Sequence, residues 1–382
     1  FSALMTAVAA QVGTGNLAGA AAAIAVGGPG AVFWMWVSAF FGMATAFGEA
    51  VLAQKFRRKV DGTITGGPVY YIKAAFPGLG GRLLAAIFAF LVVFSMGFVG
   101  AMVQSNAIGE SFQTAFGIPP LYTGIAVALL CFVSFSGGIR RLAALTGRLV
   151  PVMALFYMLG SALVLFRFRE NLLPAFSSIF VGAFAPQALA GGVVGVTAKK
   201  VMRLGLARGL FSHEAGVGST PHAHAVARVE HPVQQGYVAM LGVFIDTFVI
   251  LTLTALVILV TGVLTPDASL TGAALTQAGF STVLGKWGGP FIALCIFFFA
   301  FSSLLGWYFF GAANARYLFG KLGIAPYRLG VCLCVFLGAL MDVGKMWELA
   351  DLCCGLMALP NLAALLALSG LSASLLHEYR GR

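Results

Sequence analysis

Charged side chains are scarce in this 382-residue chain: Asp, Glu, Lys and Arg make up 9% of it, against 60% hydrophobic residues. Soluble domains carry about 25% charged residues, so the composition excludes an ordinary soluble globular protein. The formal net charge of +11 is scattered along the sequence and does not form the basic tract typical of a nucleic-acid partner. The composition therefore predicts an all-α polytopic membrane protein that lies in a lipid bilayer and binds no nucleic acid.

Residues that carry reaction chemistry are also few and dispersed. All six cysteines lie in apolar segments, so we expect buried thiols, no disulfides and no transition-metal site. His222 and His224 form a His-x-His pair, but side chains two residues apart on a helix point away from each other and do not share a metal. An intramembrane enzyme would need a nucleophile with a base, or a metal cluster, and the scattered Asp and His positions do not favour one. A channel would need a continuous polar lining, whereas polar residues here are isolated within the apolar runs.

Long apolar runs predict ten membrane spans joined by short loops. The spans cover about 1–26, 31–54, 83–114, 121–136, 149–167, 193–227, 237–264, 288–315, 327–341 and 346–370. We expect 170–192 on the outer surface as short helices, and 265–285 there as a loop. If the first span starts in the cytoplasm, fifteen of the 23 Lys and Arg residues fall on the inner side and eight on the outer side. This bias favours a cytoplasmic start.

The first span is interrupted at mid-depth by Gln11-Val12-Gly13-Thr14-Gly15-Asn16, with small apolar residues on both sides. Glycine weakens a helix by roughly 1 kcal/mol relative to alanine. Irregular backbone within a membrane is tolerated only where protein, a ligand or a cavity satisfies it. One interpretation is a broken helix whose amides meet an anion and whose carbonyls meet a cation. The alternative is a glycine-rich helix that packs closely against its neighbours. A dinucleotide-binding loop is excluded, because the flanks are apolar helix and not a βαβ unit.

The sixth span carries a similar interruption, Gly216-Val217-Gly218-Ser219, five spans after the first. Because five is an odd number, the two halves, about 1–167 and 193–370, would lie inverted in the membrane. Paired broken helices in inverted halves indicate the binding site of a secondary transporter. We therefore expect residues 1–382 to form a single integral membrane transporter domain.

Five stretches carry a more specific signal: VGTGNLAG (12–19), GGPGAVFWMWVSAFFG (27–42), ARGLFSHEAGVG (207–218), GVFIDT (242–247) and LADLCCGLMALP (349–360). They resemble the alanine/glycine:cation symporters, the sodium:alanine symporter family, over nearly the whole chain. The resemblance implies a ten-helix, five-plus-five inverted-repeat fold with broken first and sixth helices. It also implies sodium-coupled symport of a small neutral amino acid, alanine or glycine, across a bacterial-type plasma membrane.

The chain departs from the family pattern in two places. Members usually have one more helix before this fold, and the chain opens at Phe1 inside an apolar run, so we expect upstream sequence to be missing. The family usually has Asn-Glu where this chain has His213-Glu214, which leaves the details of the site near the sixth-span break open. Glu214 itself is either a site residue or a structural charge bonded to the broken backbone.

By the resemblance, the substrate binds between the two breaks. The amides near Gly13 and Gly15 would hold its carboxylate, and Phe211 would close over it. Gln104, a buried amide that must find partners, would suit either end of an amino acid, or would form an interhelical hydrogen bond. Thr14 would touch the ligand or bond its own helix backbone. The predicted substrate-binding residues are Gly13, Thr14, Gly15, Gln104, Phe211 and Gly216.

The resemblance also implies two sodium sites. Asp246 is a candidate site residue even without the resemblance, because an acidic residue inside a membrane span usually has a function. The first site would use the Asn16 side chain, the Gln11 carbonyl, Ser212 and Asp246. The second would use the carbonyls of Ala9, Val12 and Phe299 and the hydroxyls of Ser302 and Ser303, unless those hydroxyls only bond their own helix. No cofactor other than the coupling ion is expected. The residues do not separate sodium from a proton, rank alanine against glycine or serine, or give an oligomeric state.

Overall fold

The computed structural model describes residues 2–60, 62–185, 197–264 and 270–381, and this part of the chain is almost entirely helical. The elements up to residue 185 are α1 (Ser2–Gln11), the π-helix η1 (Gly15–Gly19), α2 (Ala20–Gly27), α3 (Gly30–Lys55), β1 (Arg58–Val60), β2 (Thr63–Thr65), α4 (Pro68–Ala75), α5 (Leu79–Val92), η2 (Val93–Gly100), α6 (Ala101–Phe116), α7 (Pro120–Ser136), α8 (Gly138–Arg167), η3 (Arg169–Asn171) and α9 (Leu172–Phe184). After residue 197 they are α10 (Ala198–His213), α11 (Pro221–Ala225), α12 (Pro232–Val243), η5 (Phe244–Leu251), α13 (Thr252–Thr261), α14 (Gly272–Leu284), η6 (Gly285–Trp287), α15 (Gly288–Phe319), η7 (Gly320–Gly323), α16 (Ile324–Gly338), α17 (Val343–Ala367) and α18 (Ser369–Arg380).

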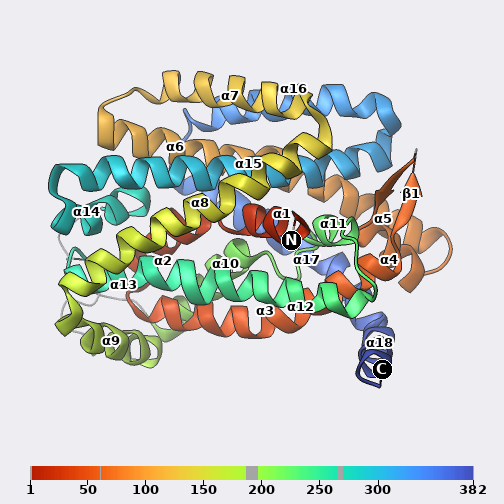
Figure 1. Cartoon of the computed structure of the whole chain (residues 1–382), viewed down its shortest axis with the longest axis horizontal. Coiled ribbons are helices and arrows are strands. Elements are labelled where there is room, and N and C mark those ends of the chain that lie inside the picture. The colour runs from red at the N-terminus through yellow and green to blue at the C-terminus, as the bar shows by residue number, and fades with distance from the viewer. Residues whose placement is uncertain (1, 61, 186–196, 265–269, 382) are drawn as a thin grey trace.

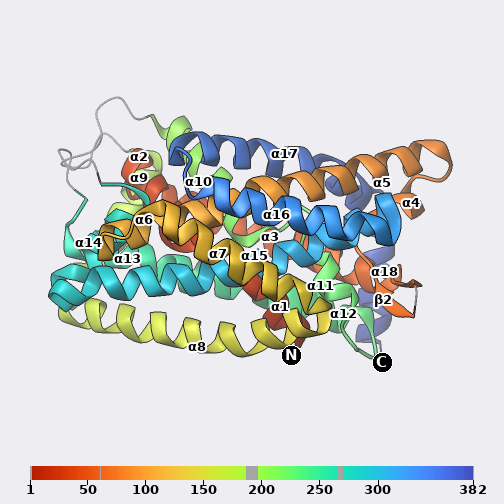
Figure 2. The same ribbon diagram turned by 90° about the horizontal axis from the view of Figure 1, so that it is seen from above.

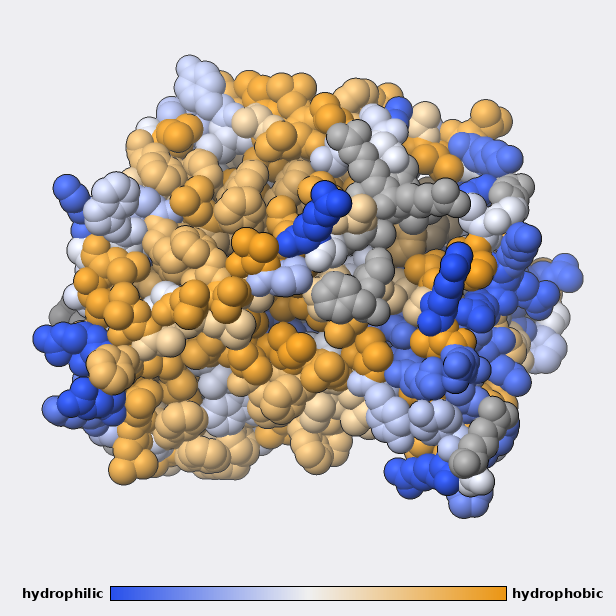
Figure 3. All heavy atoms as spheres, viewed as in Figure 1, coloured by the Kyte–Doolittle hydropathy of each residue, from blue (hydrophilic) through white to orange (hydrophobic). Residues whose placement is uncertain are grey.

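The long helices lie side by side along the longest axis of the molecule (Figures 1 and 2). The hairpin of β1 and β2, with α4 and α18, lies at one end, and α9 and α14 lie at the other. Apolar side chains cover most of the face seen in Figure 3, while hydrophilic side chains gather mainly at the hairpin end and in a smaller group at the opposite end. This distribution fits a bundle that crosses a bilayer along its long axis, with both ends in the polar regions.

The predicted spans coincide with helices wherever the structure describes them. Among the described residues, seven helical stretches are long and apolar enough to cross a membrane, and α7 is a shorter apolar helix. The sixth predicted span consists of α10 and α11, which are joined by an irregular stretch; its first residues lie outside the described part of the chain. The expectation of helix within 170–192 is met by α9, and residues 186–192 are likewise outside it.

The expectation of a loop over 265–285 was wrong for the described residues, because α14 covers most of them. Glycines and hydroxyl residues give this segment the composition of a loop. One side of the helix is buried nevertheless, with Leu275 and Phe280 in the core, and Thr276 donates to the Leu17 carbonyl of η1 at 2.9 Å. The segment is therefore part of the packing around the first broken helix.

Both predicted breaks are present. The first separates α1 from η1 at residues 12–14, and the second separates α10 from α11 at residues 214–220. Glu214 opens the second break with a φ of 54°, in the left-handed region that is unusual for a residue other than glycine. Such backbone is held by its surroundings, and these surroundings form the candidate site.

Candidate functional site

At the first break, side chains and not the helix backbone satisfy the amides of Gly13 and Thr14. The Gly13 amide donates to Asn16 Oδ1 at 3.0 Å, and the Thr14 amide donates to Gln104 Oε1 of α6 at 3.2 Å. These two adjacent amides thus point at carboxamide oxygens from two different elements. Amides arranged in this way form a site that suits the two oxygens of a carboxylate.

The two glycines of the break are required by close neighbours. A Cβ on Gly13 would lie 2.4 Å from Ser303 Oγ, and a Cβ on Gly15 would lie 3.2 Å from Ser212 Cα and 3.3 Å from the Phe211 ring. The break is therefore enclosed by α15 on one side and by the end of α10 on the other. This packing brings Gly13, Gly15 and Phe211, three of the predicted substrate residues, into one place.

Asp246 gathers the side chains predicted for the first sodium site. It is fully buried in η5, where Asn16 Nδ2 donates to Oδ1 at 2.7 Å and to the Asp246 carbonyl at 3.0 Å. Ser212 and Thr247 each donate a hydroxyl to Oδ2 at 2.9 Å. No Lys, Arg or His lies within ion-pair distance of it in the described part of the chain. The group is rich in oxygen and carries an acid without a cationic partner, which is a ligand chemistry suited to a hard cation.

Four of the five oxygens predicted for the second sodium site converge between α1 and α15. Ser303 Oγ donates to the carbonyls of Ala9 and Phe299, both at 3.1 Å. Ser302 Oγ donates to Phe299 O at 2.8 Å and to Ala9 O at 3.3 Å. Val12, the fifth residue of this set, is buried three residues after Ala9. The hydroxyls bond their own helix, as the alternative interpretation expected, and also link it to α1.

Two further predicted residues place buried polar groups at the break. Gln11 Nε2 donates to the His213 carbonyl at 2.9 Å, while Gln11 Oε1 and the Thr14 hydroxyl have no hydrogen-bond partner among the described residues. Each such group costs about 1–3 kcal/mol when it stays unpaired. Thr14 therefore does not bond its own helix backbone here, and its hydroxyl is available to a ligand at the break.

Gly216 does not join the other predicted substrate residues. Its amide donates to Glu49 Oε2 at 3.1 Å, and its carbonyl accepts from Asn361 Nδ2 at 2.9 Å. Asn361 Nδ2 also donates to Glu49 Oε1 at 2.6 Å, and Tyr71 donates to Asn361 Oδ1 at 2.5 Å. The protein itself uses both backbone groups of Gly216, which anchors the second break, and its role in substrate binding stays a prediction.

Glu49 is the residue that the sequence analysis missed. It is fully buried in α3 and joins that helix to the second break and to α17. Its signal was present, since an acid inside an apolar span is uncommon and costly.

The residues that follow Ser212 hold the second break in shape. Trp307 Nε1 donates to Glu214 Oε1 at 2.5 Å, and Ser219 donates its hydroxyl to Oε2. The His213 ring lies away from Asp246: its Nδ1 accepts from the Ala215 amide at 3.1 Å. Its Nε2 is then the protonated nitrogen and donates to Ser38 Oγ, 3.0 Å away. The His213 side chain therefore packs toward α3, and only its carbonyl contacts the first break, through Gln11.

Aromatic rings cover the break on the α10 side. The Phe211 ring meets Trp347 edge-on with centroids 4.9 Å apart, and meets Trp307 at 5.8 Å. The Arg208 guanidinium lies 4.4 Å from the Trp347 ring centroid and pairs with Asp351 at 2.8 Å. This layer joins α10 to α17 and encloses the predicted substrate position beneath Phe211.

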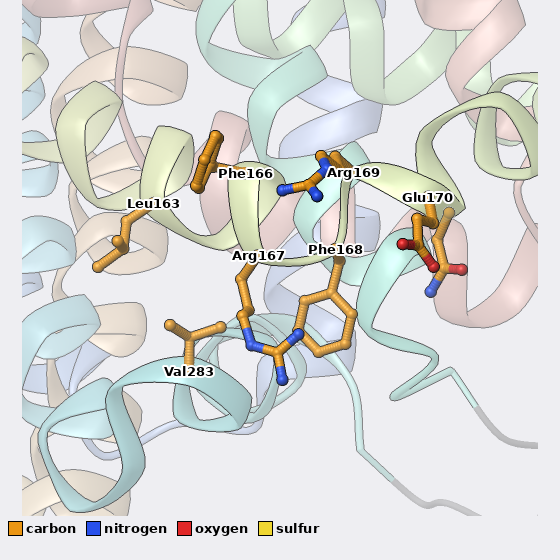
Figure 4. Close-up of a pocket in the computed structure, with 8 residues that line it drawn as sticks. Leu163, Phe166, Arg167, Phe168, Arg169, Glu170 and Val283 are labelled. Carbon is orange, nitrogen blue, oxygen red and sulfur yellow. The ribbon is translucent and has the colours of Figure 1, made fainter.

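Other candidate positions lie apart from this site. A hollow of about 340 Å³ at the end of α8 is lined by Arg167, Phe168 and Arg169, with Val283 of α14 opposite (Figure 4), and no predicted site residue lines it. His222 and His224 contact Asn314 and Gln235 respectively, and the described residues form no group of three or more metal-ligating side chains.

The helical fold that carries the two breaks is similar to that of solved structures. The crystal structure of MhsT in complex with L-phenylalanine is similar over 95% of this chain and 87% of that one, with a TM-score of 0.69 and 12% sequence identity. A manganese transporter of Eremococcus coleocola is similar over 96% and 76%, with a TM-score of 0.56 and 15% identity. The protein therefore has an all-helical, polytopic transporter fold, and the predicted fold class is confirmed.

The sequence matches the model of the sodium:alanine symporter family over residues 1–382. It is 43% identical over 378 residues to the sodium/alanine symporter AgcS of Methanococcus maripaludis, covering 98% of this chain and 82% of that protein. It is 40% identical over 381 residues to the probable sodium/glutamine symporter GlnT of Bacillus subtilis, covering 99% and 78%. The chain belongs to the sodium:alanine symporter family: it is a sodium-coupled amino acid transporter and not an enzyme.

Proposed function

We propose that this protein imports alanine or glycine together with sodium. The observation that carries the proposal is the closeness of Gly15 to Ser212 and Phe211, 3.2 and 3.3 Å from the position of an added Cβ. An amino acid whose carboxylate meets the amides of the break has little room for a side chain beneath Phe211. This favours a small neutral substrate over the larger glutamine named for one relative.

In this proposal the first break binds the substrate. The amides near Gly13 and Gly15 hold the carboxylate, and the unpartnered Thr14 hydroxyl and the Gln104 side chain complete the polar contacts. Phe211, held under Trp347, closes the site from the α10 side.

The coupling ion binds in two places beside the substrate. One sodium is held by Asp246, Asn16 and Ser212 with the Gln11 carbonyl, and a second by the carbonyls and hydroxyls shared between α1 and α15, from Ala9, Val12, Phe299, Ser302 and Ser303. The oxygens of Asp246 and Ser212, which lie 2.9 Å apart, and those shared between α1 and α15 support these assignments. Ions at both positions fix the broken helix against its neighbours, so that one part of the bundle can move against the other around a filled site.

The location follows from the charge pattern. We propose a plasma-membrane protein in which α1 starts in the cytoplasm, because that orientation places the larger share of Lys and Arg inside. Labelling of single-cysteine variants in the hairpin and in α9 with an impermeant reagent tests this. Hairpin labelling in intact cells would contradict it.

Transport itself is tested with purified protein in proteoliposomes and labelled alanine. An inward sodium gradient should drive saturable accumulation of unchanged alanine, with competition by glycine and weaker competition by glutamine. Uptake that only equilibrates would indicate a channel, and chemical conversion would indicate an enzyme. If glutamine competes best, the amino-acid assignment is wrong although the transporter class stands.

A further inference from the structure

The Asn16 side chain is fixed between the proposed substrate and sodium positions. It is fully buried, its oxygen accepts from the Gly13 amide at 3.0 Å, and its nitrogen donates to Asp246 Oδ1 at 2.7 Å. The two partners fix this orientation. If the carboxamide were turned over, its NH2 group would face the Gly13 N–H and its oxygen would face the Asp246 carboxylate. Asn16 therefore has one orientation as long as Gly13 and Asp246 are its only partners.

The proposed ligands compete with Asn16 for both partners. A substrate carboxylate near Gly13 needs the same N–H group that now donates to Asn16 Oδ1. As an anion, the carboxylate forms the stronger hydrogen bond. A sodium ion on Asp246 needs the oxygen acceptor that Asn16 Nδ2 now uses, and it repels that NH2 group. Sodium would be bound by Asn16 only after the carboxamide turns its oxygen toward the ion.

Neither ligand alone leaves every group paired. If sodium turned Asn16 without substrate, the Gly13 amide would lose its acceptor in a buried site. If the substrate bound without sodium, Asn16 Oδ1 would lose its donor while its nitrogen stayed on Asp246. With both ligands present the carboxylate accepts from Gly13 and Asn16 Oδ1 binds sodium, so that neither of these two buried groups is orphaned.

We propose that the Asn16 carboxamide is the switch that couples substrate to sodium. When no substrate is bound, its oxygen occupies the position at the Gly13 amide that the substrate carboxylate would take. Gln104 Oε1 acts in the same way on the neighbouring Thr14 amide at 3.2 Å, so two side-chain oxygens take the place of the two carboxylate oxygens. This inference rests on the proposed function, since it needs an amino acid at the first break and sodium at Asp246.

The test measures alanine affinity at zero and at saturating sodium. In the parent, sodium should tighten alanine binding by roughly 5- to 150-fold, the usual range of such coupling. Asn16→Ala removes both the coupling oxygen and the competitor for the Gly13 amide. The sodium effect should then fall to near onefold, and the sodium-free alanine affinity should equal or exceed that of the parent. Asn106→Ala is the matched control, because Asn106 is a buried carboxamide that donates to the Gly338 and Met341 carbonyls; its sodium effect should match the parent's.

The outcomes separate this inference from the function. No alanine binding by the parent would refute the proposed substrate. Parent-like coupling in Asn16→Ala, or an equal loss of affinity at every sodium concentration, would refute the switch and leave the function standing. If that variant does not fold, sodium binding to the parent protein is measured with two fragments of the substrate. Propionate, which has the carboxylate but no amino group, should tighten sodium binding, whereas isopropylamine, which has the amino group but no carboxylate, should not. The opposite pattern, or no effect of propionate, would overturn the switch.

Discussion

Replacing Asp246 by asparagine removes the one charge at the proposed first sodium site while disturbing its hydrogen bonds little. The new side-chain oxygen can stay against Asn16 Nδ2, as Oδ1 does now at 2.7 Å. The new NH2 group then faces the hydroxyls of Ser212 and Thr247, which rotate and accept instead of donating. We therefore expect Asp246→Asn to fold and to insert normally.

The ion, in contrast, loses an anionic ligand. Two unit charges 4 Å apart attract by about 4 kcal/mol at an effective dielectric constant of about 20, and the remaining amide oxygen recovers part of this. A net loss of about 2–3 kcal/mol corresponds to sodium binding that is roughly 30- to 150-fold weaker. Asp246→Glu should restore little, because the longer chain moves the carboxylate away from Asn16 and Ser212.

The assay is sodium-titrated alanine uptake into proteoliposomes, with the melting temperature as a check of folding. Glu110→Gln in α6 is the control, because it removes an acid outside both proposed sodium sites and should leave the sodium curve unchanged. An Asp246→Asn variant with parental uptake and the parental sodium requirement would refute the reasoning, and Asp246 would then be a structural residue.

Three further substitutions test the other parts of the site. Ser303→Ala should raise the sodium concentration for half-maximal uptake several-fold without changing alanine affinity at saturating sodium. An unaltered sodium titration would mean that Ser303 has only a packing role. Gly15→Leu should abolish uptake while the protein still reaches the membrane, because the side chain would collide with Ser212; uptake near the parental rate would move the carboxylate site elsewhere. Glu49→Gln replaces one carboxylate oxygen by an NH2 group. This group cannot accept from the donors that face Glu49, the Gly216 amide and Asn361 Nδ2. It should lower the melting temperature by several degrees, since each charge-assisted hydrogen bond contributes about 1.5–3 kcal/mol. An unchanged melting curve would show that Glu49 does not hold the second break.

The sequence was enough to predict the membrane spans and the two breaks, because apolar runs and mid-span glycines are local signals. The contacts between residues around the breaks cannot be predicted from local signals. Asn16 and Asp246 lie 230 positions apart, and Ser303 lies 294 positions from Ala9, so no local pattern pairs them. Only the family resemblance placed them together.

Two features escaped prediction for physical reasons. The anchoring of Gly216 depends on Glu49 and Asn361, whose contacts arise only when α3 and α17 pack against the second break. The helix α14 has the glycines and hydroxyls of a loop, and it is helical in a setting where one of its sides is buried against the first broken helix. In both cases tertiary packing outweighs the local composition.

The central claim is that alanine and sodium cross the membrane as one unit, and the most direct test runs the coupling backwards. Proteoliposomes with equal sodium on both sides, an inward alanine gradient and clamped membrane potential should accumulate labelled sodium above its equilibrium level. The accumulation should disappear in Gly15→Leu and when alanine is equal on both sides. Sodium that merely equilibrates while alanine flows inward would contradict the account, because the two fluxes would then be independent.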